Sequence, residues 1–171
     1  MKNLLYIVLL VCVTQLQAQK TFRIINLTSN TIQIPVITTS IAGGLYPQFS
    51  SKPSGVFSVA PFATFILQNT TGLNLLRFPY VSTPASTPVL PQWDRTASST
   101  ALPTTLTAGA AGIASGTVQV FDWVQITNNG TTKTIGIIGS GYPQTLTSNG
   151  WTVSYTLTGA TGAPIYTITV Q

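Results

Sequence analysis

The chain lacks most of the side chains on which enzyme mechanisms depend. Its 171 residues include no histidine, and the only acidic residues are Asp94 and Asp122. The single cysteine, Cys12, lies within the first eighteen residues. Acid–base, nucleophilic and metal-assisted mechanisms need titratable groups near neutral pH, thiolates, or carboxylate and imidazole ligands. We therefore expect a protein that is not an enzyme and that holds no metal and no cofactor.

The chain is also poor in charge. Charged residues make up 5% of the sequence, against about 25% in average soluble domains. Beyond residue 18 the basic residues are scattered singly, whereas a surface for nucleic acid or anionic lipid needs them clustered. We expect no nucleic-acid partner. A surface of threonine, serine, asparagine and glutamine repels other copies only weakly and suits a protein that packs against something, including itself.

Residues 1–18 are typical of a secretory signal peptide. Lys2 supplies a positive start, the apolar run 4–13 is too short to span a bilayer, and Ala18 ends a small-residue cleavage site. Val11 is bulky where a small residue precedes a lipidated cysteine, which argues against lipidation at Cys12. We expect a mature domain over 19–171 that is secreted or held at the cell surface. It would have no disulfide and no integral membrane segment.

Apolar and polar residues alternate with period two along most of the chain, and this pattern indicates β-strands. Turn signals such as Asn128-Asn129-Gly130 separate the strands. About nine strands are typical of a two-sheet sandwich, so we expect an all-β, antiparallel sandwich in one domain. The predicted strands cover 21–27, 31–38, 55–60, 62–69, 73–81, 117–127, 132–138, 150–158 and 164–170.

Residues 82–116 differ in composition from the rest of the chain. They are rich in serine, threonine, proline and alanine, and we expect one long loop there, because long connections without secondary structure are usually functional or mobile. Trp93, Asp94 and Arg95 form its one cluster of charge and aromatic surface. Trp93 either stacks on a ligand or partner, or pins the loop back onto the sandwich.

Asp122 occupies an unusual position. Strict alternation places it with Val120 and Val124 on the face of the strand 117–127 that we expect to be core, while Phe121 and Trp123 lie on the other. A buried carboxylate without a partner is costly. We expect either an ion pair with an arginine in another apolar strand or a bulge that turns the side chain outward. The candidate partners are Arg77 and Arg23, and Asp94 is expected to pair with its neighbour Arg95.

A short pattern occurs twice. A glycine-rich turn, Tyr-Pro-Gln, a polar loop, a glycine and an apolar strand follow one another near Tyr46 and again near Tyr142. If this is a true repeat, it places two equivalent loops on the same rim of the sandwich. The two tyrosines then either add flat aromatic surface for a ligand or simply close a Gly-Pro turn.

These observations favour a secreted, non-enzymatic structural or cell-surface protein that associates with itself or with other surface proteins. Strands that are apolar on both faces support this hypothesis, because they need cover on both sides. The first alternative is a monomeric carbohydrate-binding or adhesion module that uses Trp93, Tyr46 and Tyr142. A small outer-membrane barrel is a weaker alternative, since the chain has few charges to line a lumen.

Overall fold

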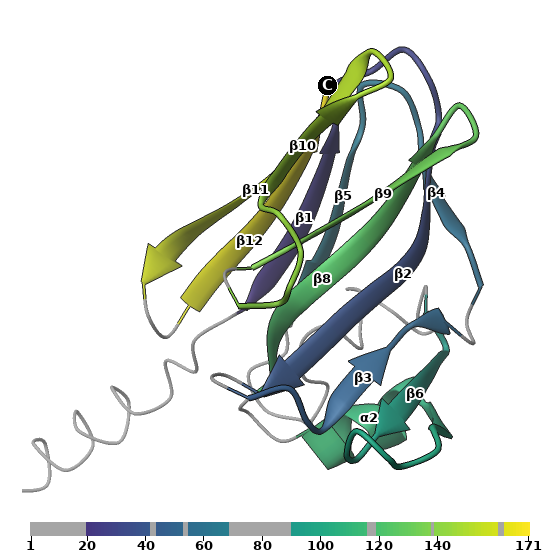
Figure 1. The fold of residues 1–171 in the computed structure, drawn as a ribbon, viewed down its shortest axis with the longest axis vertical. Helices are drawn as coiled ribbons and strands as arrows, with labels where there is room; N and C mark the ends of the chain where they lie inside the picture. The colour runs from purple at the N-terminus through teal and green to yellow at the C-terminus, as the bar shows by residue number, and fades with distance from the viewer. Residues whose placement is uncertain are drawn as a thin grey trace, which may run out of the picture.

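Two sheets with mostly antiparallel strands pack face to face, as Figure 1 shows, and this confirms the expected all-β sandwich. The computed structural model describes residues 20–41, 44–52, 55–68, 90–115, 119–137, 139–160 and 163–171. The expected signal peptide at 1–18 and the expected strand at 73–81 lie outside these residues.

The first sheet has five strands in the spatial order β10-β11-β12-β1-β5. β1 pairs with β12 in parallel and with β5 in antiparallel orientation. The first and the last strand of the described chain therefore lie side by side inside this sheet. The bounds are Thr21–Asn26 for β1, Thr64–Gln68 for β5, Thr145–Ser148 for β10, Trp151–Ala160 for β11 and Ala163–Val170 for β12.

The second sheet has seven strands. Six follow the order β7-β6-β3-β2-β8-β9, and β4 pairs separately with β2. The long strands β2 and β8 pair with each other and form the middle of the sheet (Figure 1). The bounds are Ile32–Ile41 for β2, Gln48–Ser50 for β3, Phe57–Val59 for β4, Gln92–Thr96 for β6, Thr104–Thr107 for β7, Gln119–Asn128 for β8 and Thr131–Gly136 for β9.

Phe121 of β8 joins the two sheets in the core. Its ring centroid lies 5.1 Å from that of Phe22, 5.6 Å from that of Tyr155 and 5.8 Å from that of Tyr166. The three partners belong to β1, β11 and β12 of the opposite sheet, and all four rings are buried. Burying a large apolar side chain stabilises a fold by about 1.5–3 kcal/mol, so this cluster is a main source of cohesion between the sheets.

Eight of the nine predicted strands fall within the described residues, and each is present. The alternation did not reveal β3, β6, β7 and β10. These strands have three to five residues and are mostly polar. Their backbone hydrogen bonds to neighbouring strands hold them in place, and single-strand alternation gives no sign of such pairing.

The described part of the segment 82–116 is not a structureless loop, which corrects that expectation. It contains β6, β7 and the helix α2, Ala108–Ser115. The helix packs against both strands, and its residues Ala108 and Ala111 are buried in the main core cluster together with Trp93 of β6. Alanine and glycine are small enough to let the helix lie close to the strands. A composition rich in small residues therefore did not indicate a loop here.

Candidate functional site

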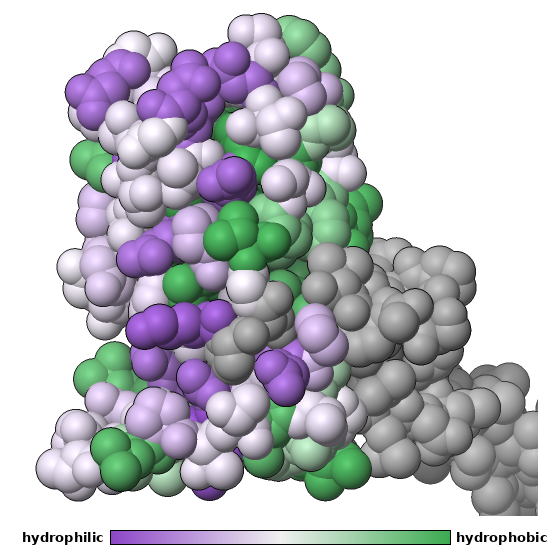
Figure 2. Space-filling model, turned by 90° about the vertical axis from the view of Figure 1, so that its right-hand side faces the viewer, coloured by the Kyte–Doolittle hydropathy of each residue, from purple (hydrophilic) through white to green (hydrophobic). Residues whose placement is uncertain are grey.

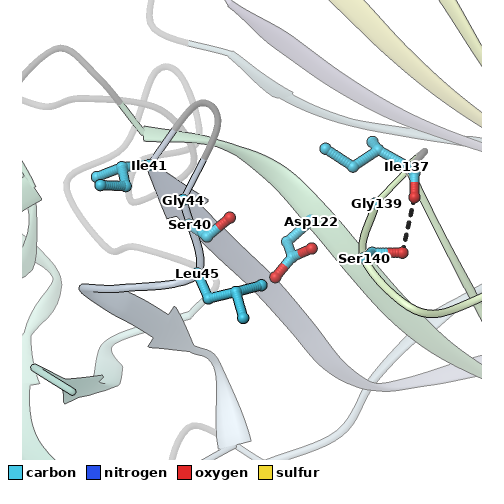
Figure 3. Close-up of a pocket in the computed structure, with 8 residues that line it drawn as sticks. All are labelled: Ser40, Ile41, Gly44, Leu45, Asp122, Ile137, Gly139 and Ser140. Carbon is cyan, nitrogen blue, oxygen red and sulfur yellow. Dashed lines mark hydrogen bonds between the residues drawn. The ribbon is translucent and has the colours of Figure 1, made fainter. Parts of the chain in front are cut away.

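A pocket of about 320 Å³ opens where the loops that follow β2 and β9 meet. In Figure 3 the carboxylate of Asp122 lies between Leu45 of the first loop and Ser140 of the second. The pocket is lined by Ser40, Ile41, Gly44, Leu45, Asp122, Ile137, Gly139 and Ser140. It is therefore walled by aliphatic side chains, with one carboxylate and two hydroxyls.

Asp122 reaches this pocket because β8 bulges at that residue. Trp123 pairs with Thr38 and Phe121 pairs with Thr39, so Asp122 has no residue opposite it in β2. An extra residue of this kind reverses the alternation of the strand beyond it. Phe121 consequently faces the core and Val120 does not, contrary to the faces expected from strict alternation. Of the two expectations for Asp122, the structure shows the bulge, but the side chain enters the pocket and stays buried instead of turning outward to solvent.

Asp122 as a residue is only 3% exposed, and the hydrogen-bond partners of its carboxylate are neutral. The Nε2 of Gln48 donates a hydrogen bond to its Oδ2 at 3.3 Å. Burial raises the pKa of this carboxyl above its usual value, and hydrogen bonds from Gln48 and Ser40 oppose that rise. No cation contributes to the shift.

The expected ion pair between Asp122 and Arg23 does not form. Arg23 lies in β1 of the opposite sheet, where its neighbours Phe22 and Ile24 face the core and it faces outward. Its guanidinium donates a hydrogen bond to the Thr167 hydroxyl at 3.0 Å. The other expected partner, Arg77, lies outside the described residues.

The two Tyr-Pro-Gln loops lie on one rim, as the repeated pattern predicted, because residues that precede both motifs line the same pocket. Each loop is tied to a strand through its proline carbonyl. Gln119 Nε2 donates to the Pro47 oxygen at 3.0 Å, and the Gly136 amide donates to the Pro143 oxygen at 3.1 Å. The Tyr46–Pro47 peptide bond is cis. These anchors fix the walls of the pocket.

The two candidate tyrosines differ in exposure. Tyr142 is 41% exposed, and its ring lies 5.4 Å from that of Trp123, centroid to centroid. Tyr46 is half-buried in the first loop. Aromatic surface at this rim therefore consists mainly of the tilted Trp123–Tyr142 pair. Of these two residues, the sequence analysis had singled out only Tyr142 as a candidate for binding.

Trp93 is fully buried, and its indole Nε1 donates a hydrogen bond to the Leu90 oxygen at 3.2 Å. Its ring is not available at the surface to stack on a sugar or a partner. The alternative expectation, that Trp93 pins the segment 82–116 onto the sandwich, fits its place in the core cluster with Ala108 and Ala111.

Asp94 and Arg95 do not form the expected pair. Successive residues of a strand point to opposite faces, and both lie in β6. Asp94 instead accepts a hydrogen bond from the Thr105 hydroxyl of β7 at 2.6 Å, while Arg95 Nε is buried without a hydrogen-bond partner in the described chain. Asp94 does not line the Asp122 pocket.

Sequence analysis missed three polar residues around Asp122. They are Ser40, Gln48 and Ser140, which come from β2, β3 and the loop after β9. Gln48 belongs to the first Tyr-Pro-Gln motif, so the motif held a usable signal. The two serines are two among many in this sequence, and only the pairing of β2 with β8 brings Ser40 to the carboxylate.

Within the described ranges, no three His, Cys, Asp or Glu side chains gather as a metal site would need. No helix there is long and apolar enough to cross a membrane. Comparison with known proteins gives no match to this chain among family models, curated proteins or solved structures.

Proposed function

We propose that the protein is a secreted, non-enzymatic structural or cell-surface protein that packs against further copies of itself. The observation that carries this proposal is the outer face of the five-stranded sheet, here called the threonine face. Ten of sixteen residues on this face carry a hydroxyl group. The sixteen are Thr21, Arg23, Ile25, Thr64, Ile66, Thr145, Thr147, Thr152, Ser154, Thr156, Thr158, Ala160, Ala163, Ile165, Thr167 and Thr169.

The strand register places these hydroxyl groups in rows across the sheet. Ser154 lies between Thr145 and Thr169 in neighbouring strands, and Thr156 pairs with Thr167. Such a face contains no carboxylate, and Arg23 is the one charged residue in the set. Interface centres are depleted in charged residues, because burying an unpaired charge is costly. The threonine face is therefore suited to burial against another flat sheet.

A second copy of the chain is the partner that fits this face best. Sheets pack face to face about 10 Å apart, and a face with Arg23 as its one charge meets an identical face with little charge repulsion. Two-fold association through one shared patch is the commonest form of self-assembly. The side of the molecule seen in Figure 2 carries hydrophilic and apolar residues in scattered patches. Charged residues make up only 5% of the sequence, which keeps electrostatic repulsion between copies weak.

Size-exclusion chromatography with light scattering tests the proposal on the mature chain. We expect the wild type to elute as an assembly and Thr156→Lys to dissociate it, because two copies would then bring like charges together. Thr132→Lys is the matched control, since Thr132 is an exposed strand threonine of the other sheet that pairs with Thr127. A wild type that remains a monodisperse monomer at high concentration would overturn the proposal.

Carbohydrate binding or adhesion through loop aromatics is the second candidate, and the exposed Tyr142, packed against the half-buried Trp123, favours it. Aromatic faces stack well on apolar surfaces such as one side of a sugar ring. We expect Tyr142→Ala to abolish retention on a glycan array while the circular dichroism spectrum stays unchanged. Phe62→Ala, at an exposed aromatic in the turn before β5, is the control. The candidate is dismissed if the wild type retains no glycan.

A further inference from the structure

We infer that the Asp122 pocket is a binding site for a primary alkylammonium group, with Asp122 as its counter-charge. The inference goes beyond the proposed packing function and does not depend on it. It stands on three features of the described residues: a buried carboxylate without a cation, a pocket beside it, and a set of acceptors that matches an ammonium group.

The carboxylate has no counter-charge in the described chain. Its hydrogen-bond partners are the neutral side chains of Gln48 and Ser40. Lys133 donates to the carbonyl oxygens of Ser148 and Trp151. Lys20 donates to the backbone of Gln119. Buried carboxylates in proteins are normally paired with a cation or neutralised, so a bound cation would supply the counter-charge that the described residues lack.

The pocket has the dimensions and walls for a short organic cation. Its volume of about 320 Å³ lies at the lower end of the range for small-molecule sites. Ile41, Leu45 and Ile137 supply aliphatic walls that would cover methylene groups. Gly44 and Gly139 have no side chains to narrow it. Figure 3 shows the carboxylate directed into the space between the two loops.

The acceptors around the pocket match the three N–H bonds of a primary ammonium group. The Asp122 carboxylate is the first acceptor, and the hydroxyl oxygens of Ser40 and Ser140 are the others. The Ser140 hydroxyl donates its own proton to the Ile137 oxygen at 2.7 Å and accepts from the Tyr142 amide at 3.2 Å. Because a hydroxyl oxygen has two acceptor lone pairs and the Tyr142 amide uses one, the second lone pair remains for a ligand.

Other ligand classes fit less well. Calcium takes six to eight oxygen ligands, usually with several carboxylates, and this pocket offers one carboxylate. A sugar is usually held by an aromatic platform, whereas the walls here are aliphatic and the Trp123–Tyr142 pair is not among the lining residues. A single charge with an apolar surround is the arrangement that suits an alkylammonium ion.

The test is a titration of the ¹⁵N-labelled mature protein with n-butylammonium chloride, followed by two-dimensional NMR. We expect saturable shifts centred on Ser40, Asp122 and Ser140. Asp122→Asn should weaken binding at least tenfold, and Ser140→Ala should weaken it less. Asp94→Asn is the matched control, because it removes the other acid of the chain and lies outside the pocket. Its affinity should equal that of the wild type.

Three results would overturn the inference. They are no saturable shifts with n-butylammonium, equal shifts with the neutral isostere n-butanol or with potassium chloride at the same ionic strength, and full affinity in Asp122→Asn. A parallel titration with Nα-acetyl-lysine methylamide separates two sources of the same chemistry. Binding of both probes supports capture of a lysine side chain from a polypeptide. Binding of n-butylammonium alone supports capture of a free amine.

Discussion

The ammonium group of Lys133 lies 3.7 Å from the ring centroid of Trp151 and donates a hydrogen bond to the carbonyl oxygen of the same residue. A second bond, of 2.8 Å, reaches the Ser148 oxygen. Lys133 belongs to β9 of the seven-stranded sheet, and both acceptors flank the β10–β11 turn of the other sheet. This buried lysine therefore ties the two sheets together at that end of the sandwich.

Replacing Lys133 should destabilise the fold strongly. Lys133→Met keeps much of the apolar stem but leaves two carbonyl oxygens without their donor and removes the cation–π contact. Because hydrogen bonds to charged groups contribute about 1.5–3 kcal/mol each, we expect a loss of at least about 2 kcal/mol in the free energy of unfolding, measured by urea denaturation. Lys52→Met, at an exposed lysine, should change it by less than about 0.5 kcal/mol.

Asp122 should make stability depend on pH. Its pKa in the folded chain is raised above the ordinary value of 3.8, mainly by burial. The folded state then binds more protons than the unfolded state between 3.8 and the raised pKa. The stability that this group contributes is fully present below pH 3.8 and is lost as pH rises through the folded pKa.

Urea midpoints measured across this pH window check the prediction. In Asp122→Asn the decline in stability with rising pH should disappear, because the amide does not titrate. Asp94→Asn should retain the decline. If the urea midpoints of Asp122→Asn and of the wild type change with pH in the same way, burial does not raise the pKa of the Asp122 carboxyl.

Gly136 should not tolerate a side chain. A Cβ there would lie 2.7 Å from the Asp122 carbonyl oxygen and would also clash with the Ser140 hydroxyl. Overpacking of this kind typically costs about 1–3 kcal/mol, so Gly136→Ala should lower the thermal midpoint and shift the NMR signals of the pocket. Gly109→Ala in α2 meets no atom within 4 Å and, as a helical substitution, should be neutral or stabilising by about 0.5–1 kcal/mol. Equal midpoints for the two variants would contradict the prediction.

Trp93 should act in stability and not in recognition. Truncating a large buried aromatic to alanine costs about 3–5 kcal/mol, so Trp93→Ala should unfold at a much lower urea concentration than the wild type. Trp93→Phe keeps most of the packing but loses the hydrogen bond to the Leu90 oxygen, and we expect an intermediate loss. A fully stable Trp93→Ala variant would show that α2 and β6 are not held by this ring.

Alternation along the chain was sufficient to predict the fold class. Residues such as Val153 and Tyr155 face the core while Thr152 and Ser154 do not, and period-two burial follows from the geometry of any extended strand. The same signal fails for short strands such as β3 and β10, because a few polar residues carry no pattern and are placed by pairing with their neighbours.

The candidate site was predictable only in outline. Sequence alone singled out Asp122 and the two Tyr-Pro-Gln loops, because a carboxylate in an apolar strand and a repeated turn are visible in one dimension. The expected pair with Arg23 was wrong, because Arg23 faces outward from the opposite sheet, while a bulge in β8 directs Asp122 toward Gln48. A one-residue change of register reverses the faces of a strand, and only pairing with β2 fixes where that change occurs.

The sequence by itself determined that this protein has few charged residues and only two acids, because composition does not depend on conformation. Only the tertiary structure decided what those few groups do. Long-range pairing of strands places Lys133 against Trp151 and leaves Asp122 buried beside a pocket without a cation in the described chain. These are contacts between residues far apart in sequence, and local patterns carry no information about them.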